Sequence, residues 1–361
     1  MGAGNVLPAY LQALDRLVPR ALAAEGPVCA RRTETWPALR ERRPGLAVVT
    51  RPEEVFEAED VDLVVILTPP ASHPELVRAA LTAGRHVLCE KPLARSAAEA
   101  AELFEQAERG GRHLVAAPFV HLNLTFRRLW TLLRDGALGR VHAARSHYGH
   151  GASTWAAWYH QEPTATLGDA AIYNLKSLAA LLGPVVEVRA ASAMAAPRLA
   201  IGGQEVEASD PDTWQLVLRH EGGALSSVLA SHATVHYRRP GIELYGTEGT
   251  ANLLGDDWDP QGIELWQEVS ARWEQLEPED ATWLWTDGLR DIVAAIRDGR
   301  SPLAEPLLDV HLHEVISAAA QAAASGTAVA VESRFPELGA LRYEPPPPGH
   351  VHDRTRPPDE Q

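Results

Sequence analysis

The sequence predicts two domains of different class: a doubly wound α/β domain built on a parallel sheet, then an α+β domain whose large open sheet is mostly antiparallel. Three observations carry this prediction. Apolar runs of strand length alternate with segments of helical periodicity over residues 1–118. Strand-like segments then follow one another with few helices over 119–345. The last stretch, 346–361, is rich in proline and charge and is predicted to be disordered.

The elements of the first domain are predicted from local pattern and capping signals. Leucines recur at helical spacing from Leu7 onward, which predicts the first helix. Ser96 and Glu99 have the spacing of a capping box, and Gly84 is expected to end the helix before them. The expected helices are 7–24, 36–43, 73–84 and 96–110, and the expected strands are 26–30, 46–50, 61–70, 86–90 and 113–119.

The second domain departs from this alternation. A strand with alternating apolar residues is expected at 141–150, and a Trp-rich loop then precedes a helix over 168–182. Five strand-like segments follow without a helix between them, which predicts an antiparallel sheet. These segments are 185–196, 212–220, 224–236, 241–254 and 262–268, and the other expected helices are 124–135, 283–298 and 306–324.

The composition is that of a globular protein and limits the classes of partner. Hydrophobic residues make up 45% of the chain and charged residues 22%. The formal net charge of −15 argues against nucleic acid or an anionic membrane surface as the main partner. Two cysteines, Cys29 and Cys89, lie in apolar runs, which favours the reducing cytoplasm over a disulfide framework. Neither a membrane span nor an export leader is expected.

The chain opens on a Gly-Ala-Gly turn that leads at once into a helix. Such a turn lets the backbone approach a pyrophosphate and faces it with helix N–H groups, as in dinucleotide-binding fingerprints. The turn normally follows the central strand of the sheet, and here only Met1 precedes it. Because the flanking strands would then lack a partner, we expect the natural chain to begin upstream of Met1. The cofactor-binding residues expected here are Gly2, Ala3, Gly4, Asn5 and Val6.

The strand that follows ends with two arginines, where an acidic residue would hold a ribose hydroxyl. Their guanidinium groups suit a 2′-phosphate, so NADP is favoured over NAD; the alternative is that both arginines are simply solvated. Two later loops also lie at the carboxyl ends of predicted parallel strands, where ligands bind in such sheets. The cofactor contacts expected at these places are Ala30, Arg31, Arg32, Thr68, Pro69, Pro70, His73, Glu90, Lys91 and Pro92, although a solvent-facing His73 is the alternative.

Lysine is rare in this chain. Among 33 basic residues it occurs only at Lys91 and Lys176, so arginine serves wherever a surface cation is enough. A lysine that is retained offers an amine whose pKa a cleft can shift, which arginine does not. Lys91 follows a predicted strand directly, and we expect it to orient a substrate or to relay a proton; the alternative is a lysine that only caps the end of the strand.

A helix in the second domain carries a polar stripe. Asp169, Tyr173 and Lys176 stand at i, i+4 and i+7, which places them on one helix face. This stripe is either a proton-transfer set or an ordinary polar face. The rings of Trp155, Tyr159 and His160 precede the helix and suit stacking on a sugar, with a core-packing loop as the alternative. The histidines are scattered and no G-x-S-x-G elbow occurs, so neither a metal site nor a serine hydrolase is expected.

Taken together, these motifs resemble the glucose–fructose oxidoreductase/inositol dehydrogenase family (Gfo/Idh/MocA). The matching segments occur in family order and span nearly the whole chain. They are GAGNV, TPPASHPEL, CEKPLA, FRRLWTLLRDGALGRV, LGDAAIYNLKSLAALLGPV and ELYGTEGTANL. The resemblance implies a Rossmann domain followed by a domain with a large open sheet, packed into homodimers or homotetramers.

The resemblance also implies an NAD(P)-dependent oxidoreductase of sugars, inositols or related polyols. It implies that Lys91 orients the reacting hydroxyl or carbonyl and that Asp169 supports Lys91. Tyr173 stands where many members carry a catalytic histidine, and the Tyr-Asn pair resembles a branch of the family. Ala171 replaces the glycine usual between these positions. A rival from another class is a nucleotide-binding or regulatory protein without turnover. The substrate contacts expected are Trp155, Tyr159, His160, Asn174 and Lys176.

Overall fold

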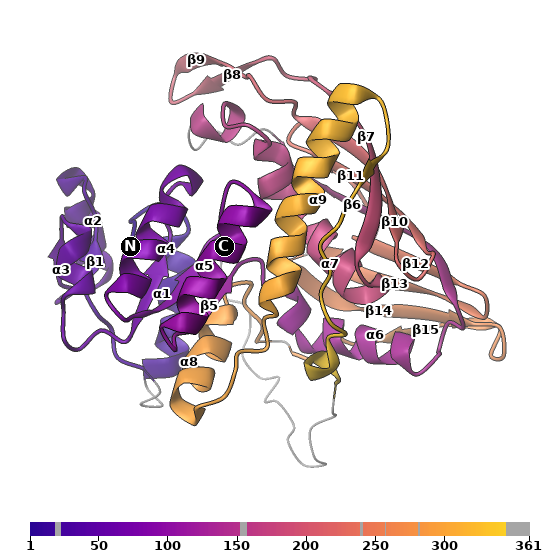
Figure 1. Cartoon of the computed structure of the whole chain (residues 1–361), viewed down its shortest axis with the longest axis horizontal. Coiled ribbons are helices and arrows are strands. Elements are labelled where there is room, and N and C mark those ends of the chain that lie inside the picture. Colours follow the sequence, from indigo (N-terminus) through magenta and orange to yellow (C-terminus); the bar gives the residue numbers. More distant parts are fainter. Residues whose placement is uncertain (19–22, 152–156, 239–240, 257, 281, 344–361) are drawn as a thin grey trace.

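The computed structural model of the chain describes all residues except 19–22, 152–156, 239–240, 257, 281 and 344–361. Figure 1 shows a lobe of short strands and helices beside a larger lobe, in which helices cover one face of a long sheet. This architecture confirms the predicted fold class. The predicted tail, 346–361, and the predicted substrate residue Trp155 lie outside the described residues. Among the described helices, none combines the length and the apolar character that crossing a membrane requires.

The first lobe is built from short parallel strands joined by helices, as the alternation predicts. β1 pairs with β2, and β4 lies between β3 and β5. Ser96 begins α5 by accepting a hydrogen bond from the N–H of Glu99, which confirms the expected cap. The second bond of the expected capping box is not formed with Ser96, because the Glu99 carboxylate accepts from the N–H of Arg95. The strands are β1 (Val28–Cys29), β2 (Val48–Val49), β3 (Leu63–Ile66), β4 (His86–Cys89) and β5 (Leu114–Ala116), and the helices are α1 (Leu7–Leu17), α2 (Trp36–Arg42), α3 (Pro52–Phe56), α4 (His73–Thr82) and α5 (Ala97–Arg109).

Met1 and Gly2 lie between these two groups of strands. The amino group of Met1 donates to the carbonyl of Val65 over 2.7 Å, and the N–H of Leu67 donates to the carbonyl of Met1 over 2.8 Å. On the other side, the N–H of Gly2 donates to the carbonyl of Cys29 over 2.9 Å. The two residues therefore join β3 to β1 at their carboxyl ends. The expectation that the natural chain begins upstream of Met1 stays a prediction.

The second lobe contains a nine-stranded sheet in the order β15-β14-β13-β12-β6-β11-β10-β7-β16. Its neighbours are antiparallel except β6 and β11, which run parallel. The strands are β6 (Val141–Gly149), β7 (Val185–Ala193), β10 (Thr213–His220), β11 (Leu225–Ser231), β12 (Ile242–Gly246), β13 (Gly249–Asp256), β14 (Asp259–Gln267), β15 (Arg272–Leu276) and β16 (Val329–Ala330), and β8 (Arg198–Ile201) and β9 (Gln204–Glu207) form a separate hairpin.

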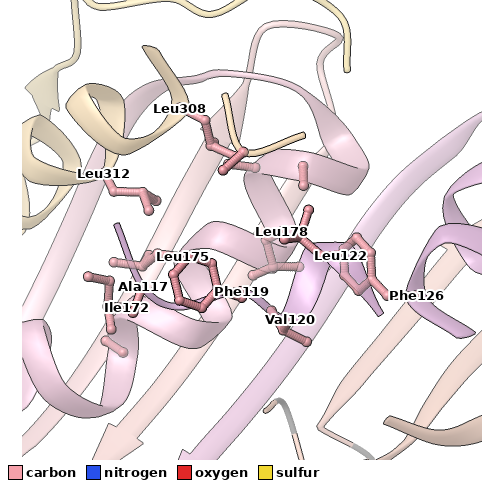
Figure 2. Packing of buried hydrophobic residues seen from close by; sticks show 14 of the residues in the cluster. Ala117, Phe119, Val120, Leu122, Phe126, Ile172, Leu175, Leu178, Leu308 and Leu312 are labelled. Atoms are coloured by element: carbon pink, nitrogen blue, oxygen red, sulfur yellow. The ribbon is translucent and has the colours of Figure 1, made fainter. Parts of the chain in front are cut away.

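Helices cover one face of this sheet and connect it to the first lobe. α7 (Ile172–Leu182) packs on β6 and β11, and α9 (Pro306–Ser325) packs against β7 on one side and α5 on the other (Figure 1). α8 (Gly288–Asp298) returns to pack on α1, and α6 (Leu124–Arg134) contacts β14. The core between them is aliphatic and aromatic (Figure 2); it includes Phe119, Phe126, Ile172, Leu175, Leu178, Leu308 and Leu312.

Some predicted boundaries are wrong. The first helix ends at Leu17 rather than at 24, and Pro19 lacks the N–H that a longer helix needs. The segment predicted as one strand over 241–254 is a hairpin of β12 and β13, turned at residues 247–248. The helix predicted over 168–182 begins with a π-helical turn, Leu167–Ala171, before α7.

Candidate active site

The turn at the start of the chain lies against the end of β3. Gly2 has a φ of 95°, and a Cβ at this position would lie 2.8 Å from the carbonyl oxygen of Leu67, so glycine is required. α1 then begins with no side-chain cap from Val6 and no acidic residue in its first turn. Its leading N–H groups therefore suit an anionic ligand such as a pyrophosphate. The residues present at this turn fit a dinucleotide.

Two exposed arginines follow β1. The carbonyl of Ala30 accepts a hydrogen bond from the Trp36 indole over 3.1 Å, which fixes the backbone just before Arg31. The side chains of Arg31 and Arg32 lie on the surface. Their contact with a cofactor phosphate stays a prediction.

His73 does not face a cofactor, and this expectation is wrong. The residue is fully buried, and its ring nitrogens lie 2.7 Å from the carbonyl oxygens of Thr68 and Pro92. At the first position of α4 the ring points between the loop after β3 and the loop after β4. His73 therefore joins these two loops, and burial lowers the pKa of its imidazole.

Glu90 connects the loop after β4 to α1. Its carboxylate accepts a hydrogen bond from the hydroxyl of Tyr10 over 2.7 Å and another from the N–H of Lys91 over 3.1 Å. Glu90 is 6% exposed, so it supports the loop from inside. The next side chain, Lys91, is directed toward the second lobe.

Lys91 and Asp169 form the centre of the site. The Lys91 ammonium pairs with Asp169 Oδ1 and also donates to the carbonyl oxygen of Asp169 over 3.1 Å. The π-helical turn, Leu167–Ala171, supplies both of these acceptors. One turn later, the ring of Tyr173 lies 5.2 Å from Lys91 Nζ. The structure thus brings together the three residues predicted to be catalytic, from a loop of the first lobe and a helix of the second.

Three further side chains surround the Asp169 carboxylate. The hydroxyl of Tyr159 donates to Oδ1 over 2.6 Å, and Nε2 of His232 lies 2.9 Å from Oδ2. Nε2 of His150 lies 3.7 Å from the same oxygen. Tyr159 was expected at the site, whereas His150 and His232 were missed by the sequence reasoning.

The missed histidines follow two neighbouring strands. His150 comes directly after β6, and His232 directly after β11. These strands are parallel, so their carboxyl ends meet at one edge of the sheet. A sheet expected to be antiparallel puts the ends of adjacent strands at opposite edges, which is why no grouping was expected. The available signal was a histidine just beyond each strand, at His150 and His232.

The electrostatics of the site fix most of its protonation states. Burial opposes both charges, but the ion pair raises the pKa of Lys91 and holds the pKa of Asp169 well below its usual range. Burial raises the pKa of Tyr159 and of Tyr148, whose ring packs 5.6 Å from that of Tyr173. The nearby Asp169 carboxylate raises the pKa of His150. Lys91 and Asp169 are therefore charged near neutral pH, and Tyr148 and Tyr159 are neutral.

Two predicted substrate residues lie elsewhere, and a third lies behind the site. Asn174 and Lys176 are fully buried, so their assignment as substrate contacts is wrong. Each residue of a π-helical turn rotates less about the helix axis than a residue of an α-helix. Lys176, seven residues after Asp169, therefore does not lie on the same helix face as Asp169. Lys176 instead pairs with Asp309 of α9 over 2.6 Å. His160 is 4% exposed and packs edge-on against His232, so it does not offer a face to a sugar.

Three of these residues are also grouped closely enough for a metal ion. One donor atom each from His150, Asp169 and His232 lies within 4.8 Å of the others. The Lys91 ammonium occupies the same carboxylate, and a second cation there would be repelled by it. The hydrogen bonds to Asp169 described above account for the close grouping of these side chains. The expectation that the protein has no metal site stays a prediction.

Family models match both lobes. One described as "Oxidoreductase family, NAD-binding Rossmann fold" matches residues 1–117, and one described as "GFO/IDH/MocA C-terminal domain" matches residues 126–252. The two matched ranges follow one another along the chain as the two lobes do. Together they include the Gly-Ala-Gly turn, the loop that carries Lys91, Asp169, and the ends of β6 and β11.

Proteins with similar sequences include dehydrogenases from other organisms. Trans-1,2-dihydrobenzene-1,2-diol dehydrogenase of Bos taurus is 28% identical over 58% of this chain and 59% of its own length. Myo-inositol 2-dehydrogenase of Thermotoga maritima is 28% identical over 58% of this chain and 63% of its own. The chain therefore matches less than two thirds of either relative.

A solved structure supports the fold over a longer span. Aldose–aldose oxidoreductase from Caulobacter crescentus has a TM-score of 0.73 at 20% identity, covering 85% of this chain and 92% of that one. At this identity the likeness concerns the fold. Both domains of one family are thus matched in sequence and arranged in the same fold, and the chain belongs to the Gfo/Idh/MocA oxidoreductase family.

Proposed function

We propose that this protein transfers a hydride between a nicotinamide cofactor, with NADP preferred over NAD, and a hydroxyl or carbonyl group of a sugar or polyol. The observation that carries the proposal is the Lys91 ammonium, held by Asp169 where the two lobes meet. Lys91 directly follows Glu90, whose carboxylate is hydrogen-bonded to Tyr10 of α1, the helix that follows the nucleotide-binding turn. A positive charge is thereby fixed beside the place where ligands bind in doubly wound sheets.

Each residue of the centre has a role in this proposal. The nicotinamide, when bound, supplies or accepts the hydride. Lys91 donates a hydrogen bond to the substrate oxygen and stabilises the negative charge that develops there during reduction. Asp169 holds the ammonium in place through its carboxylate and its carbonyl. Tyr173, packed against the ammonium, limits its movement and offers a phenol to the same substrate oxygen.

The substrate class is supported by the names of the similar proteins. A dihydrobenzenediol dehydrogenase, an inositol dehydrogenase and an aldose–aldose oxidoreductase all act on compounds that carry several hydroxyl groups. The Tyr159 phenol beside the Asp169 carboxylate offers a hydrogen bond to such compounds.

The preference for NADP is supported by the pair Arg31 and Arg32. We expect the double variant Arg31→Ala/Arg32→Ala to bind NADPH at least about tenfold more weakly, because two guanidinium groups that face a 2′-phosphate are lost. NADH lacks that phosphate, so its affinity should stay unchanged. Nicotinamide fluorescence titrations with both cofactors measure the two dissociation constants. Arg109→Ala, an exposed charge at the far end of α5, is the matched control and should change neither.

If the double variant bound NADPH and NADH more weakly by the same factor, the arginines would shape the loop rather than recognise a phosphate. Tighter binding of NADH than NADPH by the unchanged protein would contradict the NADP preference itself.

Turnover is tested with a panel of keto-sugars, aldoses, inositols and their oxidised forms, offered with NADPH, NADP, NADH and NAD. We expect oxidation or reduction of at least one member to change the nicotinamide absorbance. Cofactor binding without turnover of any member would favour a binding or regulatory role instead.

We also propose a homodimer or homotetramer. Among the described residues, three large apolar side chains of the nine-stranded sheet are exposed, with between 44% and 51% of their surface accessible: Val217, Leu225 and Trp273. An exposed sheet face with large apolar side chains is typical of an interface between copies. Light scattering should give two or four times the chain mass, and Val217→Arg should lower it; a monomer would contradict the proposal.

A further inference from the structure

Asp169 contacts different partners through its two carboxylate oxygens. Oδ1 accepts from Lys91 and Tyr159, whereas Oδ2 faces His232 at 2.9 Å and His150 at 3.7 Å. An ionised carboxylate placed in this way can take a proton at one oxygen and, after turning, donate that proton to the neighbour of the other oxygen. It therefore connects the ammonium to an imidazole.

Of the two imidazoles, His150 is the one that reaches solvent. Its side chain is 37% exposed, and that of His232 is 1% exposed. Nδ1 of His150 lies 2.8 Å from the carbonyl oxygen of Gly151, so Nδ1–H donates there and Nε2 faces Asp169. One water molecule, or a small rotation of this exposed side chain, closes the remaining 3.7 Å.

We propose that His150 exchanges the reaction's proton with solvent, through Asp169 and Lys91. The inference rests on the proposed hydride transfer and adds a proton route to it. His232, buried and bonded to Oδ2, orients the carboxylate in this route and does not exchange with water. Because His150 follows β6, the route enters from an element separate from α7, which carries Tyr173.

In the direction of reduction, the carbonyl group gains one hydride and one proton. The nicotinamide delivers a hydride to the carbonyl carbon, the C=O π bond breaks, and the oxygen takes a proton from Lys91 Nζ. Asp169 starts ionised and takes a proton at Oδ2 from His150 Nε2. The carboxyl group then turns about its Cβ–Cγ bond and passes the same proton to the neutral Lys91 amine, which leaves Asp169 ionised again. Water then protonates His150. The product is an alcohol, and the net change is one hydride from the cofactor and one proton from solvent.

The other titratable groups around His150 do not duplicate this role. Tyr148 on the same strand is held neutral by burial, which raises its pKa, and Lys91 and Asp169 are held charged by their pairing. The neighbouring Asp169 carboxylate raises the pKa of His150, and burial and the Lys91 charge oppose this less strongly. Its imidazolium form therefore persists to higher pH than that of a free imidazole.

The sign of the pH dependence follows from the protonated donor. Reduction needs the imidazolium, so kcat for reduction should be highest below the pKa of His150 and should fall as pH rises through it. Oxidation needs the neutral imidazole, so its kcat should rise over the same interval.

The test compares His150→Gln with the unchanged enzyme on a substrate found in the panel. We expect kcat for reduction to fall about 10²-fold, as for loss of a proton-transfer group, and the limb assigned to His150 to disappear from the pH profile. NADPH affinity and the substrate KM should stay within about threefold, because neither ligand is bound through this side chain. Added imidazole should restore part of kcat, since the exposed position leaves it access to Asp169.

His142→Gln is the matched control, because His142 is an exposed histidine at the other end of β6. It should leave kcat and the pH profile unchanged. A His150→Gln enzyme that keeps the full rate and the full profile would overturn the proton route and leave the hydride transfer standing. A lower rate without any change of profile and without imidazole rescue would assign His150 a packing role and also overturn it. An unchanged protein with no turnover on any substrate would remove the proposed function together with this route.

Discussion

Replacement of Lys91 by alanine is expected to lower kcat for sugar or polyol turnover by at least about 10²-fold, the loss seen when one donor to a developing oxyanion is removed. The ammonium is fixed by Asp169 and is directed to the place where the substrate oxygen is expected. NADPH affinity should stay within about tenfold, a margin of roughly 1.4 kcal/mol, because the ammonium is paired with Asp169 of the second lobe. Steady-state kinetics and fluorescence titration measure the two quantities.

Arg95→Ala is the control for this substitution. Arg95 lies four residues further along the same loop, is largely exposed, and pairs with Glu99 at the start of α5. The control removes one positive charge from the same region and should leave kcat unchanged. Full activity of Lys91→Ala would contradict the proposed mechanism, whereas loss of NADPH binding would show that the substitution disrupts the loop.

Lys176→Met is expected to give the largest loss of stability, about 3–5 kcal/mol of the free energy of unfolding, as when a buried ion pair loses one partner. Lys176 and Asp309 are both nearly inaccessible, and Lys176 also donates to the carbonyl of Ala116 over 3.2 Å. The substitution leaves the Asp309 carboxylate and the Ala116 carbonyl buried without this donor. Urea unfolding followed by circular dichroism gives the change.

The double variant Lys176→Met/Asp309→Leu tests the cause. Because both charges are then absent, most of the lost stability should return. Arg198→Ala breaks an exposed pair with Glu205 in the β8–β9 hairpin and should leave the unfolding curve unchanged. A Lys176→Met protein as stable as the unchanged chain would contradict the assignment of this lysine to the core.

The rarity of lysine indicated that Lys91 and Lys176 have specific roles. The structure places Lys91 in the candidate site and Lys176 in the core. Lys91 lies in the loop that follows β4 and reaches the site, because the carboxyl ends of parallel strands face the ligand edge. Lys176 lies on the inner face of α7 and binds α9 to it. Composition identified both as unusual, but only the packing of α7 against α9 separates a site residue from a core residue.

The first lobe was predictable because its signals are local. Alternating periodicity, the Ser96 cap and the glycine turn each depend on a few adjacent residues, and each is found where it was expected. The fold class follows from the same reasoning, whereas the grouping of Lys91 with Asp169 was implied by the family resemblance.

Two features of the site could not be predicted in this way. The π-helical turn Leu167–Ala171 is a backbone state that the spacing of Asp169 and Lys176 does not reveal. The pairing of β6 with β11 joins strands far apart in the sequence, and its parallel direction alone brings His150 and His232 to one carboxylate. Nonlocal pairing of strands therefore decides which histidines belong to the site.

The central claim, that this site serves hydride transfer between a nicotinamide and a sugar or polyol, is tested most directly by isotope transfer. The protein is incubated with NADPH that carries deuterium on the transferable position of the nicotinamide and with each carbonyl compound of the panel. We predict deuterium on the new alcohol carbon of at least one product by mass spectrometry, and loss of that label with Lys91→Ala. Binding of NADPH without label in any product would contradict the account.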